Sequence, residues 1–204
     1  MKPYVSIMKR SMDIIFSTIG LLLLLPLWPI IILAIKLETK GPVLFFQERV
    51  GLDGRNIRMM KFRTMFTDAE KHTGPVWATE NDQRVTRVGA FLRKTRLDEV
   101  PQLIHVLKGE MSLVGPRPER PFFVDRFAAK IPFYEERMMN VKPGITGLAQ
   151  IYSGYDTSIE SVKEKLMYDH GYGVCLTRFK CFLIVDFSIL LATIKVVFTG
   201  KGAK

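Results

Sequence analysis

The segment IIFSTIGLLLLLPLWPIIILAI, residues 14–35, decides how this chain folds, because it contains no charged residue. A straight helix of that length would be about 33 Å long, which is enough to cross the hydrocarbon core of a bilayer. The run ends in Lys36, Glu38 and Lys40, with no site of small residues after it. This pattern disfavours a cleaved signal peptide. The segment therefore predicts a membrane anchor.

Two prolines interrupt the anchor. Pro26 lies in its middle and Pro29 follows one turn later. Proline removes a backbone hydrogen bond and clashes with the preceding turn, so a bend is expected near Leu25 and Pro26. Basic residues flank both ends: Lys2, Lys9 and Arg10 precede the run, and Lys36, Lys40 and Arg49 follow it. Because basic flanks favour the cytoplasm, a re-entrant helix satisfies both of them, and a kinked spanning helix is the alternative.

Composition limits the rest of the chain to one basic domain. The 204 residues include 30 Lys and Arg against 20 Asp and Glu, which gives a net charge of +10. A basic surface attracts nucleic acid, anionic lipid or phosphorylated substrates, and charge alone does not choose among them. Cys175 and Cys181 lack the spacing of a zinc site or of a secreted disulfide framework. They are expected to be reduced thiols in the core of a cytoplasmic domain.

The pattern of apolar residues predicts an α/β fold: a single small domain, mostly helical with short strands, over residues 41–204, following an anchor over residues 1–40. Gly51–Arg55 (GLDGR) is typical of a hairpin turn between short strands. Gly115–Pro118 (GPRP) is expected to be a stiff loop. Helices are expected at Val85–Lys94, from about Asp98 to Gly109, and over Arg120–Met139, Ser158–His170 and Arg178–Phe198. The last of these suits a core helix or an amphipathic helix in the membrane interface.

Asp98 and Glu99 are the most suggestive candidates for chemistry. Adjacent carboxylates at the start of a helix can share a divalent cation, and one of them can attack phosphorus as a nucleophile. Free amides at the helix N-terminus favour an ionised carboxylate and a phosphate beside it. The plainer alternative is a helix cap followed by an acidic first turn.

Several basic residues accompany this pair. Arg117 lies between two prolines, which suits bidentate phosphate binding, although a solvent-exposed turn arginine is the plainer alternative. Asp169 is either a second acid or a helix partner for a lysine. The basic stretch around the acidic pair comprises Lys61, Arg63, Arg84, Arg87, Arg93, Lys94 and Arg96. No phosphate-binding glycine motif occurs, the histidines have no ligand pattern, and nothing indicates nucleic-acid binding.

Six blocks occur in order along the chain. They are Lys9-Arg10 with Asp13, GPVLFFQERVGLDGR (41–55), KFRTM (61–65), RVTRVGAFLRKTRLDEVPQL (84–103), LKGEMSLVGPRPE (107–119) and VKPGITGLAQ (141–150). This series resembles the bacterial sugar transferase family, the monotopic phosphoglycosyl transferases. The resemblance covers the chain from about Lys9 to Gly202.

The resemblance implies a re-entrant anchor broken at Pro26, on the cytoplasmic face of the bacterial inner membrane. It implies Mg²⁺-dependent transfer of a sugar 1-phosphate from a UDP-sugar to undecaprenyl phosphate, with release of UMP, as the first membrane step of a glycoconjugate, capsule, lipopolysaccharide or exopolysaccharide pathway. Asp98 would carry the phosphosugar covalently, and Glu99 would assist through Mg²⁺ or proton handling. The residues that match family positions implicated in activity, expected here to bind substrate, are Lys61, Arg93, Arg117 and Asp169.

The chain departs from the family pattern at two places. Leu25-Pro26 replaces the usual Ser-Pro at the break, so a hydroxyl that could satisfy the broken backbone is absent. Tyr152–Tyr155 stands where family members often carry a Gly-Arg pair. A non-catalytic membrane scaffold or regulator of the same fold is the alternative function. The sugar, the pathway and the oligomeric state are left open.

Overall fold

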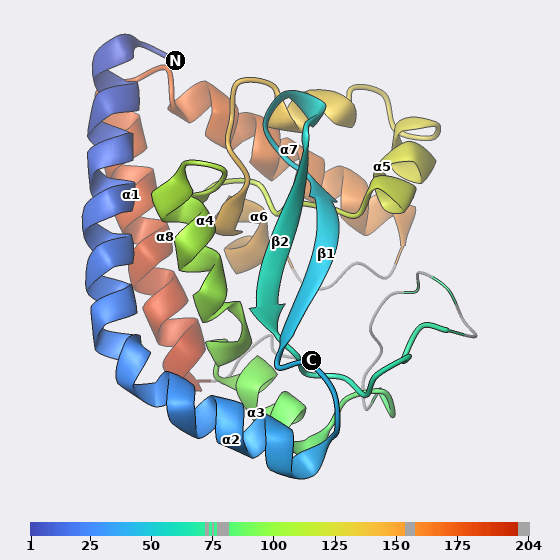
Figure 1. The fold of residues 1–204 in the computed structure, drawn as a ribbon. Helices are drawn as coiled ribbons and strands as arrows, with labels where there is room; N and C mark the ends of the chain where they lie inside the picture. Colours follow the sequence, from blue (N-terminus) through green and yellow to red (C-terminus); the bar gives the residue numbers. More distant parts are fainter. Residues whose placement is uncertain (72–73, 75, 77–81, 154–157, 200–204) are drawn as a thin grey trace.

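The computed structural model describes residues 1–71, 74, 76, 82–153 and 158–199. It begins with two helices, α1 (Pro3–Leu24) and α2 (Trp28–Glu38), joined by the 3-10 turn Leu25–Leu27. Pro26 lies in this turn, and Figure 1 shows that the chain changes direction sharply there. The predicted bend is therefore present, and the helical stretch Pro3–Glu38 is long and apolar enough to enter a membrane.

Short strands and further helices make up the remainder. β1 (Leu44–Val50) pairs with β2 (Asn56–Phe62) as an antiparallel hairpin, and β3 (Ser112–Val114) pairs with β4 (Gly144–Thr146) in parallel. The helices are α3 (Arg87–Lys94), α4 (Leu103–Lys108), α5 (Pro121–Ala128), α6 (Leu148–Tyr152), α7 (Ile159–Cys175) and α8 (Phe179–Thr199). The structure is thus a mostly helical small domain with short strands.

The structure corrects three of the predicted elements. The segment at Asp98 begins as the 3-10 turn Leu97–Gln102, which contains Pro101, and the α-helix starts only at Leu103. The helix expected over Arg120–Met139 ends at Ala128. No helix was expected between Met139 and Ser158, but Leu148–Tyr152 forms the short helix α6.

The surface pattern of α1 is the reverse of that of a soluble helix. Its buried residues are Val5, Lys9, Asp13 and Ser17, one every four positions, so that most of the buried stripe is polar. Its outer face is apolar and includes Ile7, Ile15, Leu22 and Leu23. A surface helix in water buries its apolar stripe and exposes its polar one. This arrangement suits a helix whose outer face meets lipid.

Polar contacts attach α1 to the domain. Lys9 Nζ lies 2.7 Å from a carboxylate oxygen of Asp186 on α8, and both side chains are buried. Asp13 accepts a hydrogen bond of 3.0 Å from the Ser112 hydroxyl on β3. Arg10 donates to two carbonyl oxygens at the end of α4, at 2.5 and 2.6 Å. Figure 1 accordingly shows α1 running alongside α8 and α4.

The helices α1 and α2 form a bent pair, and its second helix, α2, is attached to the domain through both apolar packing and a polar contact. α2 buries Ile31 and Ile35 against Phe62 of β2 and Leu92 of α3. Glu38, the last residue of α2, accepts hydrogen bonds from the first two backbone amides of α3, at 2.7 and 3.0 Å. Both arms of the bent pair therefore contact elements that carry the candidate site.

The expectation of reduced thiols is wrong. Cys175 and Cys181 are joined by a disulfide that links the end of α7 to the start of α8. The turn between these helices brings the two Cα atoms to 5.4 Å, which lies within the range that a disulfide requires. The predicted helices Ser158–His170 and Arg178–Phe198 left a connection between them, but the first helix in fact continues to Cys175, so the connection is short enough to bring the two cysteines together.

Candidate active site

A cavity of about 1020 Å³ lies between the β1–β2 hairpin, the 3-10 turn before α4, the loop after β3 and the end of α8. The residues that line it include Leu24, at the end of α1, and Arg120, at the start of α5. One face of the hairpin contributes Phe45, Gln47 and Lys61. Both Asp98 and Glu99 line the cavity, so the acidic pair sits where elements from the whole chain meet.

The backbone at Arg96 places the acidic pair. Arg96 adopts a left-handed conformation (φ 58°) that ends α3 and starts the 3-10 turn Leu97–Gln102. Asp98 is buried, and its burial, followed by repulsion from Glu99, raises the pKa of its carboxyl to about 6. The charges of Lys61, Arg93 and Arg96 act in the opposite direction. A carboxylate with a raised pKa is a stronger base than an ordinary aspartate, which suits a nucleophile.

Glu99 has different surroundings from its neighbour. Burial acts to raise its pKa, but the nearby charges of Arg117 and Arg96 outweigh burial, so the pKa of Glu99 lies below its ordinary value. Arg117 Nη2 donates to Glu99 Oε1 at 3.1 Å. Opposite shifts in two adjacent carboxyls are typical of sites where the two groups have different roles.

Cations reach the pair from three elements. Lys61 extends from β2, and burial, reinforced by Arg49, lowers the pKa of its ammonium to about 8. Arg93 extends from α3, where its Nε donates to the Thr64 hydroxyl at 2.9 Å. Arg117 extends from the loop after β3. Each of these predicted residues lines the cavity. A ring of cations around a carboxylate pair can hold a diphosphate.

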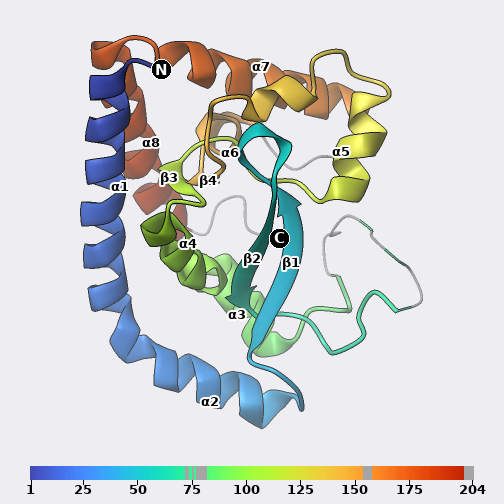
Figure 2. The same cartoon turned by 45° about the horizontal axis from the view of Figure 1, so that its top comes forward.

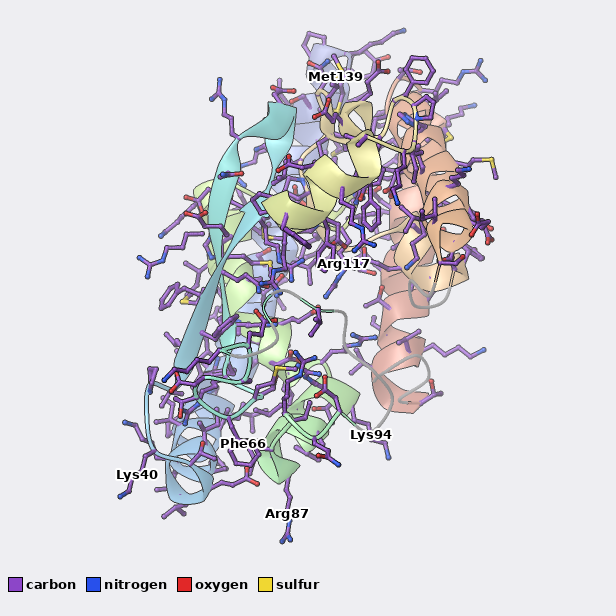
Figure 3. All side chains as sticks on the ribbon, turned by 90° about the vertical axis from the view of Figure 1, so that its right-hand side faces the viewer. Lys40, Phe66, Arg87, Lys94, Arg117 and Met139 are labelled. Carbon is purple, nitrogen blue, oxygen red and sulfur yellow. A yellow bond between two sulfur atoms is a disulfide. The ribbon has the colours of Figure 1, made fainter. Side chains whose placement is uncertain are left out.

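The loop that carries Arg117 is held closely against its neighbours. β3 and β4 lie side by side in Figure 2, so the loop leaves the sheet at the edge where α6 also begins. A Cβ added to Gly115 would lie 2.3 Å from the carbonyl oxygen of Lys142, so only glycine permits this approach. Figure 3 shows Arg117 in the middle of the molecule, well away from the basic end where Lys40, Arg87 and Lys94 lie.

Asp169 is the exception among the predicted residues. It is buried on α7, it does not line the cavity that the described residues form, and its Oδ2 lies 3.2 Å from Arg137 Nε. Burial raises the pKa of the Asp169 carboxyl, and the charge of Arg137 partly offsets this effect. Direct contact of Asp169 with substrate stays a prediction.

Sequence reasoning missed two arginines of the site. Arg49 lines the cavity and donates to Gln47 Oε1 at 3.0 and 2.6 Å, and burial lowers its pKa to about 10. Arg120 lines the cavity and forms two hydrogen bonds of 2.8 Å with Glu70. The QER triplet at 47–49 was the available signal for Arg49, but Arg49 was interpreted only as a basic flank of the anchor.

Several other basic residues have structural or surface positions. Arg63 is buried, lines the cavity and donates to the carbonyl oxygens of Thr39 and Lys40, which directly follow α2. Arg87 and Lys94 do not line the cavity among the described residues. Residues 154 and 155, where the chain departs from the Gly-Arg pattern, lie outside the described residues, as do His72, Pro75 and Gly202.

The acidic pair fits Mg²⁺ as a partial ligand set. Mg²⁺ prefers oxygen ligands and is often held by one or two carboxylates together with substrate phosphates and water. Asp98 and Glu99 supply two adjacent carboxylates in a cavity large enough for a diphosphate. No cluster of three or more metal-ligating side chains occurs among the described residues. The set therefore suits an ion that substrate phosphates help to hold.

Known proteins resemble the chain along nearly its whole length. A family model described as bacterial sugar transferase matches residues 4–200. A UDP-N-acetylgalactosamine-undecaprenyl-phosphate N-acetylgalactosaminephosphotransferase of Aeromonas hydrophila is 44% identical over 202 residues, covering 99% of this chain and 46% of the relative. A UDP-glucose:undecaprenyl-phosphate glucose-1-phosphate transferase of Klebsiella pneumoniae is 41% identical, covering 97% of this chain and 41% of the relative.

A third relative differs in the sugar that its name carries. A galactosyl transferase of Streptococcus agalactiae is 39% identical, covering 97% of this chain and 44% of the relative. The chain thus spans less than half the length of these three curated relatives. The family match extends over nearly all of the cavity-forming elements described above, from α1 to α8. By this match, the chain belongs to the bacterial sugar transferase family.

Proposed function

We propose that the chain transfers a sugar 1-phosphate from a UDP-sugar to undecaprenyl phosphate and releases UMP. The observation that carries the proposal is the adjacent pair of buried Asp98 and partly buried Glu99, with its opposite pKa shifts, inside a ring of cations. Such a ring favours two anionic substrates, and a desolvated carboxylate is a competent nucleophile toward phosphorus. The names of the relatives support the two substrate classes.

The reaction proceeds in two displacements. An Asp98 carboxylate oxygen attacks the β-phosphorus of the donor, the bond from this phosphorus to the bridging oxygen breaks, and UMP leaves. A phosphate oxygen of the acceptor then attacks the phosphorus of the Asp98-bound phosphosugar, which restores the carboxylate and forms the diphosphate. Lys61, Arg93 and Arg117 hold the phosphates in line, and Glu99 orients Arg117. Asp98 and Glu99 would hold Mg²⁺, which would supply charge neutralisation on the phosphates.

We further propose that the bent pair α1–α2 is a re-entrant anchor on the cytoplasmic face of the inner membrane. The bend at Pro26, the apolar outer face of α1 and the polar stripe that holds it to the domain support this arrangement. Cations lie at both ends of the pair. Lys2 precedes α1 and Lys40 follows α2, and Figure 3 shows Lys40, Arg87 and Lys94 spread along the lower end of the molecule, where anionic headgroups would attract them.

The test is UMP release by the purified chain in nanodiscs containing undecaprenyl phosphate and Mg²⁺. UDP-N-acetylgalactosamine, UDP-glucose and UDP-galactose are offered separately. We expect release from at least one donor that depends on the acceptor, and loss of this release in Asp98→Asn. Asp125→Asn, which alters an exposed carboxylate of α5, is the matched control and retains activity. Equal UMP release by wild type and Asp98→Asn would overturn the proposal.

A further inference from the structure

The loop that carries Arg117 is tethered at each of five consecutive residues. Its ends are held by backbone: Gly115 N donates to Thr146 O at 2.9 Å, and Val50 N donates to Glu119 O at 2.8 Å. Gly144 N also donates to Pro116 O at 2.8 Å. The two remaining carbonyls, those of Arg117 and Pro118, are instead bound by arginine side chains from distant parts of the chain.

Arg137 binds the first of these carbonyls. One of its Nη atoms donates to the Arg117 carbonyl oxygen, and the other donates to the Tyr134 hydroxyl at 2.6 Å. Its Nε faces Asp169 at 3.2 Å, and the side chains of Arg137 and Asp169 are both nearly inaccessible to solvent. Asp169 therefore supplies the counter-charge that lets Arg137 stay buried behind the loop.

Arg49, on β1, binds the second carbonyl. Its Nη1 donates to Pro118 O at 3.1 Å and lies 3.4 Å from a carboxylate oxygen of Glu119. Gln47 fixes the rest of this guanidinium. The carbonyls of two consecutive peptides, Arg117–Pro118 and Pro118–Glu119, are thus held by two guanidinium groups, neither of which comes from the loop itself.

We infer that Arg137 and Arg49 are positioning residues that hold the Arg117 guanidinium against Glu99 and the substrate phosphates, and that Asp169 acts through Arg137. The inference rests on the proposed function for its catalytic consequence. A buried ion pair is a weak source of stability, since apolar residues of similar size often serve as well. A role in geometry explains why Asp169, which does not line the described cavity, sits behind the loop.

The first readout does not depend on activity. Hydrogen exchange of the segment 113–120 is compared in wild type, Arg137→Lys and Asp169→Asn. Lysine keeps the charge but presents its donors from a single nitrogen, so it cannot reproduce the planar guanidinium that reaches Tyr134, Arg117 and Asp169 from three nitrogens. We therefore expect exchange in this segment to be about tenfold faster. Glu38→Gln is the matched control, because it weakens the hydrogen bonds that Glu38 accepts from the first two backbone amides of α3 and changes no contact of the Arg117 loop. Thermal melting verifies that each variant is folded.

The second readout is a double-mutant cycle on kcat for UMP release. Arg137→Lys, Asp169→Asn and Arg49→Lys are each measured alone and combined with Arg117→Ala. Misplacement of a catalytic group by about 1 Å can cost about 100-fold, so we expect a loss of that order from Arg137→Lys alone. In the Arg117→Ala background the same change should have almost no further effect, because the group it positions is gone. Glu38→Gln should combine additively.

The outcomes separate the two proposals. Unchanged exchange in the loop, or losses that add fully to that of Arg117→Ala, would overturn the positioning role. If the wild-type chain releases no UMP from any donor, the proposed function is overturned. If exchange of the Arg117 loop is nevertheless faster in Arg137→Lys and unchanged in Glu38→Gln, the role of Arg137 in holding the loop remains supported.

Discussion

At the scale of single residues, the site separates two carboxyl groups that are adjacent in sequence. Asp98 faces Lys61 and Arg93 from a buried position, and Glu99 is paired with Arg117 at 3.1 Å. Glu99 is therefore ionised at neutral pH, whereas Asp98, with a pKa of about 6, titrates within about one unit of neutral pH. A buried carboxylate with a raised pKa destabilises the fold in its ionised form, so reactivity and stability are opposed at this position.

We expect Asp98→Asn to stabilise the chain as well as to inactivate it. The folded-state pKa of about 6 lies above the ordinary value of 3.8, so the penalty is present at pH 8 and disappears as pH falls to about 4. Two pKa units correspond to about 3 kcal/mol, or several degrees in melting temperature. Melting curves in Mg²⁺-free detergent at pH 8 and pH 4 measure this. An equal difference at both pH values would contradict the assignment.

We expect Lys61 to determine how activity falls at alkaline pH. Burial lowers the pKa of its ammonium to about 8, and only the protonated form attracts a phosphate. The value of kcat/KM for the donor should therefore fall about tenfold per pH unit well above pH 8, because this parameter reports the free enzyme. Lys61→Arg, whose charge persists, should move this alkaline limb to higher pH. If the alkaline limb keeps the same apparent pKa in Lys61→Arg, a group other than Lys61 is responsible for it.

At the scale of elements, the hairpin and the anchor bend were predictable, but the supports behind the site were not. GLDGR and Pro26 act on their own neighbours, so their effects are legible in sequence. Arg137 binds a carbonyl 20 positions away and Arg49 binds one 69 positions away, and such pairings leave no periodic pattern. Asp98 and Glu99 were found for the opposite reason, since adjacency makes the pair visible. The disulfide between Cys175 and Cys181 depends on a turn that composition does not encode.

The bent pair α1–α2 predicts a specific labelling pattern. Single cysteines replacing Lys2 and Lys40, in a background where Cys175 and Cys181 are serine, are exposed to a membrane-impermeant maleimide. A re-entrant pair keeps both positions on the cytoplasmic side, so both should be protected in intact cells and labelled in inverted vesicles. Replacement of both Pro26 and Pro29 by leucine should restore a continuous helix, and about half or more of the molecules should then expose Lys2→Cys outside.

The control for this experiment is the parent without single cysteines. Labelling of Lys2→Cys in intact cells of the otherwise unaltered chain would favour the kinked spanning helix over the re-entrant one.

At the scale of the whole molecule, the cavity joins the two environments that the proposed substrates occupy. Its lining includes Leu24 at the end of α1, Val196 and Val197 at the end of α8, and Arg120 at the start of α5. Apolar residues thus line the side next to the membrane helix, and cations line the side next to the loops. Because these apolar and cationic sides belong to the same cavity as Asp98 and Glu99, the arrangement favours sequential use of the acidic pair by the donor and the acceptor.

This arrangement predicts ping-pong kinetics with a burst. Without acceptor, the chain should release about one equivalent of UMP per active site and then stop, because the phosphosugar stays on Asp98. Addition of undecaprenyl phosphate should restart turnover, and double-reciprocal plots at several acceptor concentrations should be parallel. Rapid-quench measurement of UMP, with intact-mass analysis of the protein, tests both points. Asp98→Asn should give no burst and no added mass. Intersecting plots without a burst would indicate direct transfer in a ternary complex, and Asp98 would then bind the phosphates without carrying one.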